Sequence, residues 1–113
     1  YAIESDSDSI GNANVNVRAN GVADRVHVLE GDALVLLPLV APVQLVLANI
    51  ISSALRSLLP IIKASLNGGG RVILSGLLLS ERAEWRELLQ EEPWRILEES
   101  SEGDWWTVAI AKT

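Results

Sequence analysis

The feature that most restricts the fold of this chain is the apolar run from Val43 to Ala48, which ends at the polar residue Asn49. A near-continuous apolar segment of this length is typical of a parallel strand covered on both faces. A polar amide is costly to bury without a hydrogen bond, so an asparagine at the carboxyl end of such a strand indicates a ligand site. The segment predicts an α/β fold with a site beside Asn49.

Strand and helix patterns alternate along the rest of the chain. Strands are expected at residues 1–3, 26–30, 43–48 and 72–74, and helical spacing of apolar residues follows at 10–17, 51–62 and 81–89. Asn20-Gly21 supplies a stop for the first helix, and Pro93 ends the last one. This alternation predicts an open, largely parallel sheet that binds ligands beyond the carboxyl ends of its strands.

Prolines and glycines punctuate this pattern. Pro38 and Pro42 predict a loose apolar linker, and Pro60 is expected to divide the helical segment 51–62 into two short helices. Asn67 to Gly70 predicts a tight turn before a strand; no Lys-Ser or Lys-Thr follows it, so it is not a phosphate loop. Residues 94–99 and 105–111 predict a closing antiparallel hairpin.

The charge of the chain limits its partners. The 113 residues carry a net charge of -6, and their nine Lys and Arg form no basic run, so direct binding to nucleic acid is not expected. Cysteine is absent, which is compatible with a reducing cytosol. No apolar run reaches the roughly 20 residues that span a bilayer. The sequence predicts a soluble, cytoplasmic protein with a buried core.

Acidic residues follow the first two predicted strands. Glu4 offers two acceptor oxygens that suit the two hydroxyls of a ribose, and its alternative role is to cap the following helix. Asp32 is placed to receive the exocyclic amine of adenine, and its alternative role is to turn the chain. Both alternatives stay open on the sequence.

Several conspicuous side chains are interpreted as structural. His27 is expected in the middle of a strand, with no nucleophile or second histidine placed to form a catalytic set. Trp85 and the pair Trp105-Trp106 are expected to pack against the sheet or a partner surface.

Five segments together resemble the catalytic domain of the ribosomal protein L11 methyltransferases, which are class I enzymes that use S-adenosylmethionine. They are Ala2-Ile3-Glu4-Ser5-Asp6, Asn16 to Val22, Leu45 to Ile51, Gly69 to Gly76, and Gly103-Asp104-Trp105-Trp106. The resemblance covers residues 1–113 and implies one partial catalytic domain with a Rossmann-like sheet. It also implies transfer of a methyl group to amino groups of a ribosomal protein.

The resemblance assigns roles to three residues. Glu4 matches the acid that holds the cofactor ribose, where the family usually has Asp, and Asp32 is a weaker match to the adenine-side acid. Asn49 matches the asparagine that lies beside the methionine end of the cofactor and the incoming amine. An uncharged amine would attack the methyl carbon in line with the departing sulfur, and Asn49 would hold that amine without deprotonating it.

Elements of the family are not found in this chain. It begins at Tyr1 and contains no Met, and the glycine-rich loop, the strand before it and the recognition domain lie upstream in the family. We therefore expect an amino-terminally truncated domain that does not methylate alone and that fills its open sheet edges by self-association. The alternatives are an inactive, self-associating fragment and a different nucleotide-binding module, such as a nicotinamide enzyme.

Overall fold

Two compact units, Tyr1–Ala41 (unit 1) and Pro42–Thr113 (unit 2), make up the chain in the computed structural model, which describes all residues 1–113. The elements of unit 1 are β1 (Ala2–Glu4), α1 (Ser7–Ala19), β2 (Val28–Glu30) and α2 (Ala33–Val40). Those of unit 2 are β3 (Val43–Asn49), α3 (Ser52–Ser65), β4 (Leu66–Leu78), the 3-10 turn η1 (Leu79–Glu81), α4 (Arg82–Glu91), β5 (Trp94–Glu102) and β6 (Trp105–Lys112). Each helix falls short of the length and apolarity that a membrane crossing requires.

Unit 1 contains a two-stranded parallel sheet in which Glu4 of β1 lies opposite Glu30 of β2. Asp6 caps the start of α1 by accepting a hydrogen bond from the Asp8 backbone N–H, and Gly21 (φ 65°) follows its end, so this helix is confirmed. His27 was predicted inside a strand, which is wrong because β2 begins one residue later. Only its carbonyl is tied to the sheet, by a bond from the backbone N–H of Ala2.

The linker predicted around Pro38 and Pro42 is partly wrong, because residues 33–40 form the helix α2. Asp32 caps this helix by accepting a hydrogen bond from the Leu34 backbone N–H, which supplies a start signal. Pro38 lies inside the helix, where it removes one backbone hydrogen bond of an eight-residue element. The helix nevertheless forms, and Leu37 is its buried side chain.

Unit 2 contains a four-stranded sheet with the order β3-β4-β6-β5. β3 and β4 are parallel, whereas β6 is antiparallel to both β4 and β5. The predicted carboxyl-terminal hairpin is therefore confirmed, and Gly103 supplies its turn with φ 57°. The predicted α/β class is confirmed as well.

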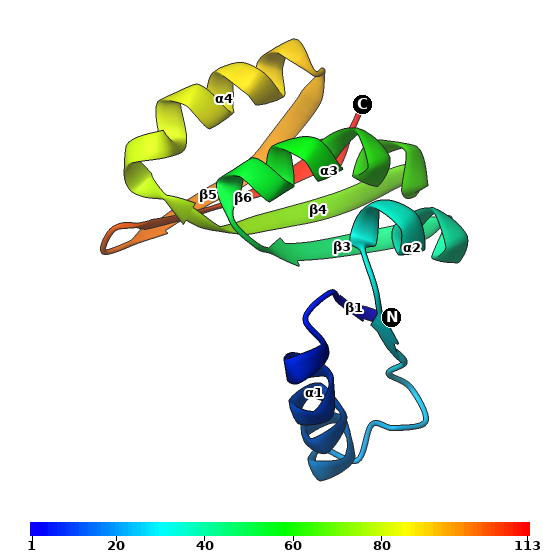
Figure 1. The fold of residues 1–113 in the computed structure, drawn as a ribbon. Helices are drawn as coiled ribbons and strands as arrows, with labels where there is room; N and C mark the ends of the chain where they lie inside the picture. The colour runs from blue at the N-terminus through cyan, green and yellow to red at the C-terminus, as the bar shows by residue number, and fades with distance from the viewer. The chain divides into compact units, whose positions relative to one another are not determined.

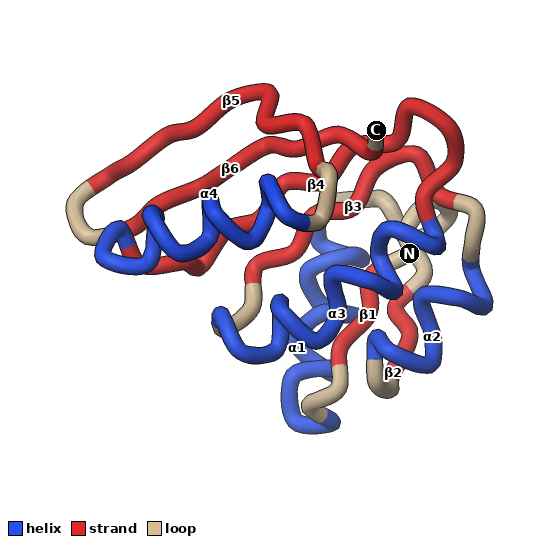
Figure 2. Tube along the Cα trace, turned by 90° about the horizontal axis from the view of Figure 1, so that it is seen from above, coloured by secondary structure: helices blue, strands red, loops and turns tan.

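Helices α3 and α4 lie on the same face of this sheet (Figure 1), and a view along the perpendicular direction also shows α4 running beside β6 and β5 (Figure 2). The side chains that are almost fully buried gather between these helices and that face: Leu55, Leu59, Ile62, Val72, Leu74, Leu77, Trp85, Leu89, Trp106, Val108 and Ile110. All of them belong to unit 2, so the core of the chain lies there. Unit 1 buries a single hydrophobic side chain, that of Leu37.

The opposite face of the four-stranded sheet is uncovered within unit 2. Leu45 is 54% exposed and Leu47 is 69% exposed, whereas Ala48, which points the other way, is 7% exposed. The prediction that β3 is covered on both faces is therefore wrong. Both helices of unit 2 cover one face, and β3 also forms the edge of the sheet with β4 as its only partner.

Two predicted breaks in unit 2 are also wrong. α3 runs continuously through Pro60, because the buried apolar stripe of the helix outweighs the one backbone bond that proline removes. Asn67 to Gly70 does not precede the strand but lies inside β4, between the pairs Val43–Leu66 and Leu45–Arg71. These residues bulge out of the ladder, and Gly69 (φ 77°) allows the bend.

One-sided coverage predicts unequal effects of two leucine truncations. Leu74→Ala removes a fully buried side chain and is expected to lower the free energy of unfolding by about 2–5 kcal/mol. Leu47→Ala is expected to change it by less than about 1 kcal/mol, because most of that side chain is already in water. Urea unfolding followed by circular dichroism measures both, and equal losses would contradict a bare sheet face.

Candidate functional site

The carboxyl ends of β1 and β2 carry the acidic residues predicted in unit 1. Because the two strands are parallel and paired in register, their ends meet at one edge. The backbone N–H of Gly31 donates to the carbonyl of Glu4 at 2.9 Å, which fixes the turn before Asp32 against the end of β1. The structure thus brings Glu4 and Asp32 to the same edge of unit 1.

Both acids already make local hydrogen bonds. Glu4 Oε1 accepts from the Asp6 backbone N–H at 3.0 Å, and Asp32 Oδ1 accepts from the Leu34 backbone N–H at 2.9 Å. Each acid therefore has the local structural role that the sequence left open as the alternative to ligand binding. A carboxylate has about four acceptor positions on two oxygens, so each acid retains Oε2 or Oδ2 for a further donor. The capping bonds also fix the direction in which each carboxylate points.

Asn49 ends β3 in unit 2 and is exposed, which differs from the predicted buried amide. Its partner in the ladder is Ser75 of β4, and Gly76 follows with φ 75°. A Cβ placed on Gly76 would lie 2.5 Å from Asn49 Oδ1, so the carboxamide rests directly on the glycine backbone. Any other residue at position 76 would push the amide away. The convergence of Asn49 with Glu4 on one ligand stays a prediction.

A cavity of about 710 Å³ lies next to this amide, between the amino-terminal ends of α3 and α4. Gly76 forms part of its wall, which places the cavity beside Asn49. Its charged lining residues are Arg56, Glu81 and Glu84. Trp105, which is 57% exposed, is another of the lining residues.

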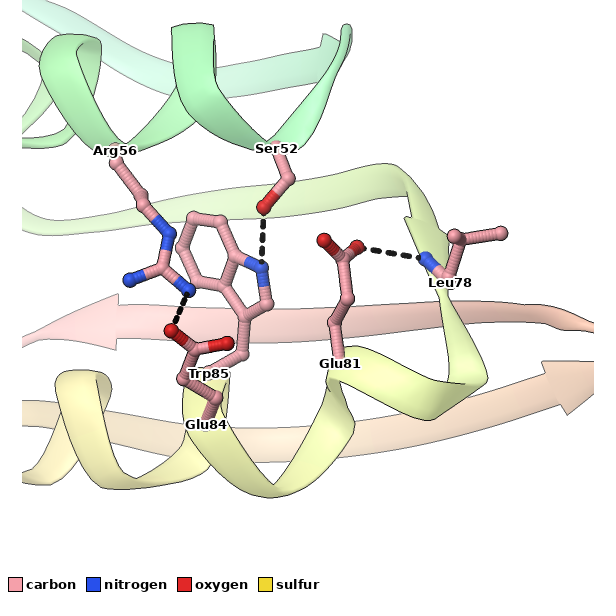
Figure 3. A network of polar contacts seen from close by, with 6 residues as sticks. All are labelled: Ser52, Arg56, Leu78, Glu81, Glu84 and Trp85. Carbon is pink, nitrogen blue, oxygen red and sulfur yellow. Dashed lines mark hydrogen bonds and ion pairs between the residues drawn. The ribbon is translucent and has the colours of Figure 1, made fainter.

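A polar network holds the two helix ends in place (Figure 3). The buried indole of Trp85 donates from Nε1 to Ser52 Oγ at 3.0 Å, which links α4 to the first residue of α3. The Arg56 guanidinium lies 5.0 Å from the centre of the Trp85 ring and pairs with Glu84 at 3.0 Å. Glu81 accepts from the Leu78 backbone N–H at 3.1 Å.

No pattern in the sequence predicts this network or the cavity. Ser52 and Arg56 are half-buried on α3, and Glu84 lies 28 residues further along on an exposed position of α4, so nothing in the sequence pairs them. One signal was available: adjacent residues of a strand point to opposite faces, so Trp105 and Trp106 could not both pack against the core. Trp106 is 1% exposed and Trp85 is fully buried, as predicted, whereas Trp105 lines the cavity.

The family model for ribosomal protein L11 methyltransferase (PrmA) matches residues 1–113. A ribosomal protein L11 methyltransferase from Thermus thermophilus is 34% identical over 100 residues, which cover 88% of this chain and 38% of that protein. A probable cobalt-precorrin-6B C(15)-methyltransferase (decarboxylating) from Methanothermobacter thermautotrophicus is 31% identical over 91 residues, which cover 80% of this chain and 47% of that protein. The chain thus spans less than half the length of either relative.

Solved structures show the same fold. A ribosomal protein L11 methylase from Lactobacillus delbrueckii subsp. bulgaricus matches with a TM-score of 0.88 and 26% sequence identity. The match covers 99% of this chain and 57% of the solved chain. An RNA methyltransferase from Salinibacter ruber, crystallised in complex with S-adenosyl-L-homocysteine, has a TM-score of 0.68 with 20% identity and covers 96% of this chain and 62% of its own. The fold is therefore the Rossmann-like fold of class I methyltransferases, as the sequence predicted.

Removal of the Ser52 hydroxyl tests the link between α3 and α4. Ser52→Ala leaves the buried Trp85 N–H without a partner, so the free energy of unfolding is expected to fall by about 1–3 kcal/mol. Ser53→Ala is the matched control, because Ser53 is exposed on the same helix turn and gains the same helix propensity. Thermal unfolding compares the two variants, and equal stabilities would mean that the hydrogen bond contributes nothing.

Proposed function

The chain belongs to the ribosomal protein L11 methyltransferase (PrmA) family, and from that premise we propose that it forms the nucleoside-holding and acceptor-aiming part of an S-adenosylmethionine-dependent methyltransferase. The acceptor in this proposal is an amino group of ribosomal protein L11, and the reaction takes place in the cytoplasm, where ribosomal proteins act. Glu4 holds the ribose, Asp32 holds the adenine amine, and Asn49 holds the acceptor amine.

The observation that carries the proposal is the placement of Asn49. Asn49 is exposed at the carboxyl end of a parallel strand, where open α/β sheets bind ligands, and its Oδ1 occupies the space that a Cβ on Gly76 would need. Because the glycine backbone positions the Asn49 carboxamide, its oxygen and its NH₂ group remain available for a ligand. Asn49 can therefore accept a hydrogen bond from an amine and aim the nitrogen lone pair.

The acids of unit 1 fit the nucleoside half of the cofactor. When bound, S-adenosylmethionine supplies an electrophilic methyl group on a sulfonium. Glu4 Oε2 is free, and Oε1, which accepts from the Asp6 N–H, has a second lone pair, so the carboxylate can still accept from both ribose hydroxyls. Asp32 Oδ2 remains for the exocyclic amine of adenine, since Oδ1 is occupied by α2. Both residues lie in unit 1, so this half of the site is complete within residues 1–41.

A second candidate acceptor is a carbon atom of a tetrapyrrole, because one relative is named as a methyltransferase of C(15) of cobalt-precorrin-6B. A tetrapyrrole carbon does not need an amide that accepts a hydrogen bond from N–H. The exposed carboxamide of Asn49 therefore favours the amine. Methyl transfer to the isolated ribosomal protein, compared with transfer to a precorrin, separates the two acceptors.

The inactive alternative is also supported by specific features. β3 has an unpaired edge and a bare apolar face, and both favour association with a second copy of the chain. Sedimentation with and without S-adenosylhomocysteine discriminates the alternatives. Association that cofactor does not change, with no binding of cofactor, would favour the inactive fragment.

Binding of adenosine tests the role of Glu4. We expect weak, saturable binding of adenosine and of S-adenosylhomocysteine to the 113-residue chain, with similar dissociation constants, because the assigned contacts go to the nucleoside. Glu4→Gln is expected to weaken both by at least about ten-fold, through loss of charge-assisted hydrogen bonds. Calorimetry or amide chemical shifts of Ala2 and Gly31 provide the measurement.

Two variants control this titration. Asp24→Asn removes the same charge from an exposed loop residue of unit 1 and is expected to leave binding unchanged. Asn49→Ala is also expected to leave adenosine binding unchanged, because Asn49 is assigned to the amine. Adenosine binding that is insensitive to Glu4→Gln, or absent in a folded chain, would overturn the assignment of this edge.

A further inference from the structure

We propose that two copies of this chain pack through the uncovered face of the four-stranded sheet, antiparallel to each other about a two-fold axis. Helices α3 and α4 both lie on the opposite face (Figure 1), so this face has no cover within unit 2. Side chains from all four strands, β3, β4, β6 and β5, form it. The inference concerns an interaction surface and does not depend on the proposed methyl transfer.

Two neighbouring rows of side chains form the middle of this face. Directly paired residues of adjacent strands point to the same side of a sheet, so each row can be followed across the four strands. The first row is Leu45, Arg71, Ala111 and Arg95, and the second row is Leu47, Ile73, Ala109 and Glu98. Leu45, Leu47 and Ile73 are exposed. Burial of these apolar side chains supplies the driving force for association.

Small residues leave room for a second copy in the middle of the face. Ala109 and Ala111 of β6 lie between longer side chains of β4 and β5. A cavity of about 820 Å³ has Ala109, Ile73 of β4 and Leu97 of β5 among its lining residues. The side chains of two packed sheets interdigitate, and the hollow over β6 can receive side chains from a facing sheet.

The charged side chains of the face are available to a partner. They are Arg71 and Arg95 in the first row, Glu98 in the second row and Glu102 further along β5. None of the four takes part in an ion pair within the chain. Their charges sum to zero, so this face does not share the net charge of -6 that makes two copies of the chain repel each other.

A two-fold axis between the two rows satisfies the apolar and the charged side chains together. It places the first row of each copy over the second row of the other. Leu45 then faces Leu47 of the second copy, and Glu98 of the second copy faces the row that contains Arg71 and Arg95. A parallel arrangement would place the first rows over each other, arginine on arginine, which is repulsive. The charges therefore select the antiparallel arrangement.

The size of the face limits the strength of the dimer. β3 has seven residues, and four strands of this length, spaced about 4.8 Å apart, cover roughly 450 Å² in projection. A standard stable interface buries about 800 Å² per partner. We therefore expect reversible association with a dissociation constant of about 10 μM or weaker.

Reversal of single charges tests this interface by sedimentation equilibrium from about 10 μM to about 1 mM. The unchanged chain is expected to shift from monomer to dimer over this range. Arg95→Glu and Glu98→Arg are each expected to weaken self-association at least about ten-fold, because like charges then meet across the axis. An equimolar mixture of the two variants is expected to regain the association of the unchanged chain, because opposite charges face each other again.

Matched controls separate this interface from a general charge effect. Glu87→Arg reverses an exposed charge on α4, which covers the opposite face, and Arg18→Glu does so on α1 of unit 1. Both are expected to leave association unchanged. Circular dichroism checks the fold of each variant, and recovery on mixing requires folded chains.

Three outcomes would overturn the proposal. One is a monomer at every concentration, which would leave the face to a different occupant. Another is association that Arg95→Glu and Glu98→Arg leave unchanged, as pairing of two β3 edges through their backbone groups would give. The third is a mixture of the two variants that associates no better than either variant alone.

Discussion

The hydrogen bond from the buried Trp85 indole to Ser52 sets the spacing of α3 and α4, and the rest of unit 2 depends on that spacing. Trp85 of α4 is fully buried, and its N–H has a partner, whereas the buried N–H groups of Trp94 and Trp106 have none. Loss of the Ser52 partner would cost about 1–3 kcal/mol. Ser52 is the first residue of α3, so the bond fixes the start of that helix relative to α4. Arg56 then lies over the same ring and faces Glu84. The cavity is a consequence of packing, and its charged rim follows from the helix positions that the packing leaves exposed.

β3 is exposed to solvent on one face and along one edge. A parallel strand usually has helices on both faces, yet Leu45 and Leu47 of β3 face water within unit 2, and β4 is its only neighbour in the ladder. Fewer contacts per residue mean that this strand opens more easily than the central strands β4 and β6. Asn49 lies at the end of this edge strand. Anything that covers the bare face of β3 would therefore also order Asn49, which links the stability of the sheet to the geometry of the proposed reaction.

Local signals in the sequence predicted most helices and strands. Tertiary contacts determined the elements that local signals did not predict. The alternation of strands and helices, the hairpin after Pro93 and the stop at Asn20-Gly21 follow from nearest neighbours, so they were predictable. The breaks expected at Pro38 and Pro60 were overestimated, because a proline removes one bond whereas an apolar stripe contributes over a whole helix. The strand ends located Glu4, Asp32 and Asn49 on the fold. The cavity was not predictable, since it depends on which residues of α3 and α4 face each other after packing.

The uncharged amide at position 49 suits the proposed transfer of a methyl group to an amine. A carboxylate in contact with the reacting nitrogen would favour its protonated form, which has no lone pair with which to attack. An amide accepts a hydrogen bond from a neutral amine without that charge preference. The position of this amide depends on Gly76, because a Cβ there would lie 2.5 Å from Asn49 Oδ1. An uncharged group at position 49 is therefore what the proposed transfer to a neutral amine requires.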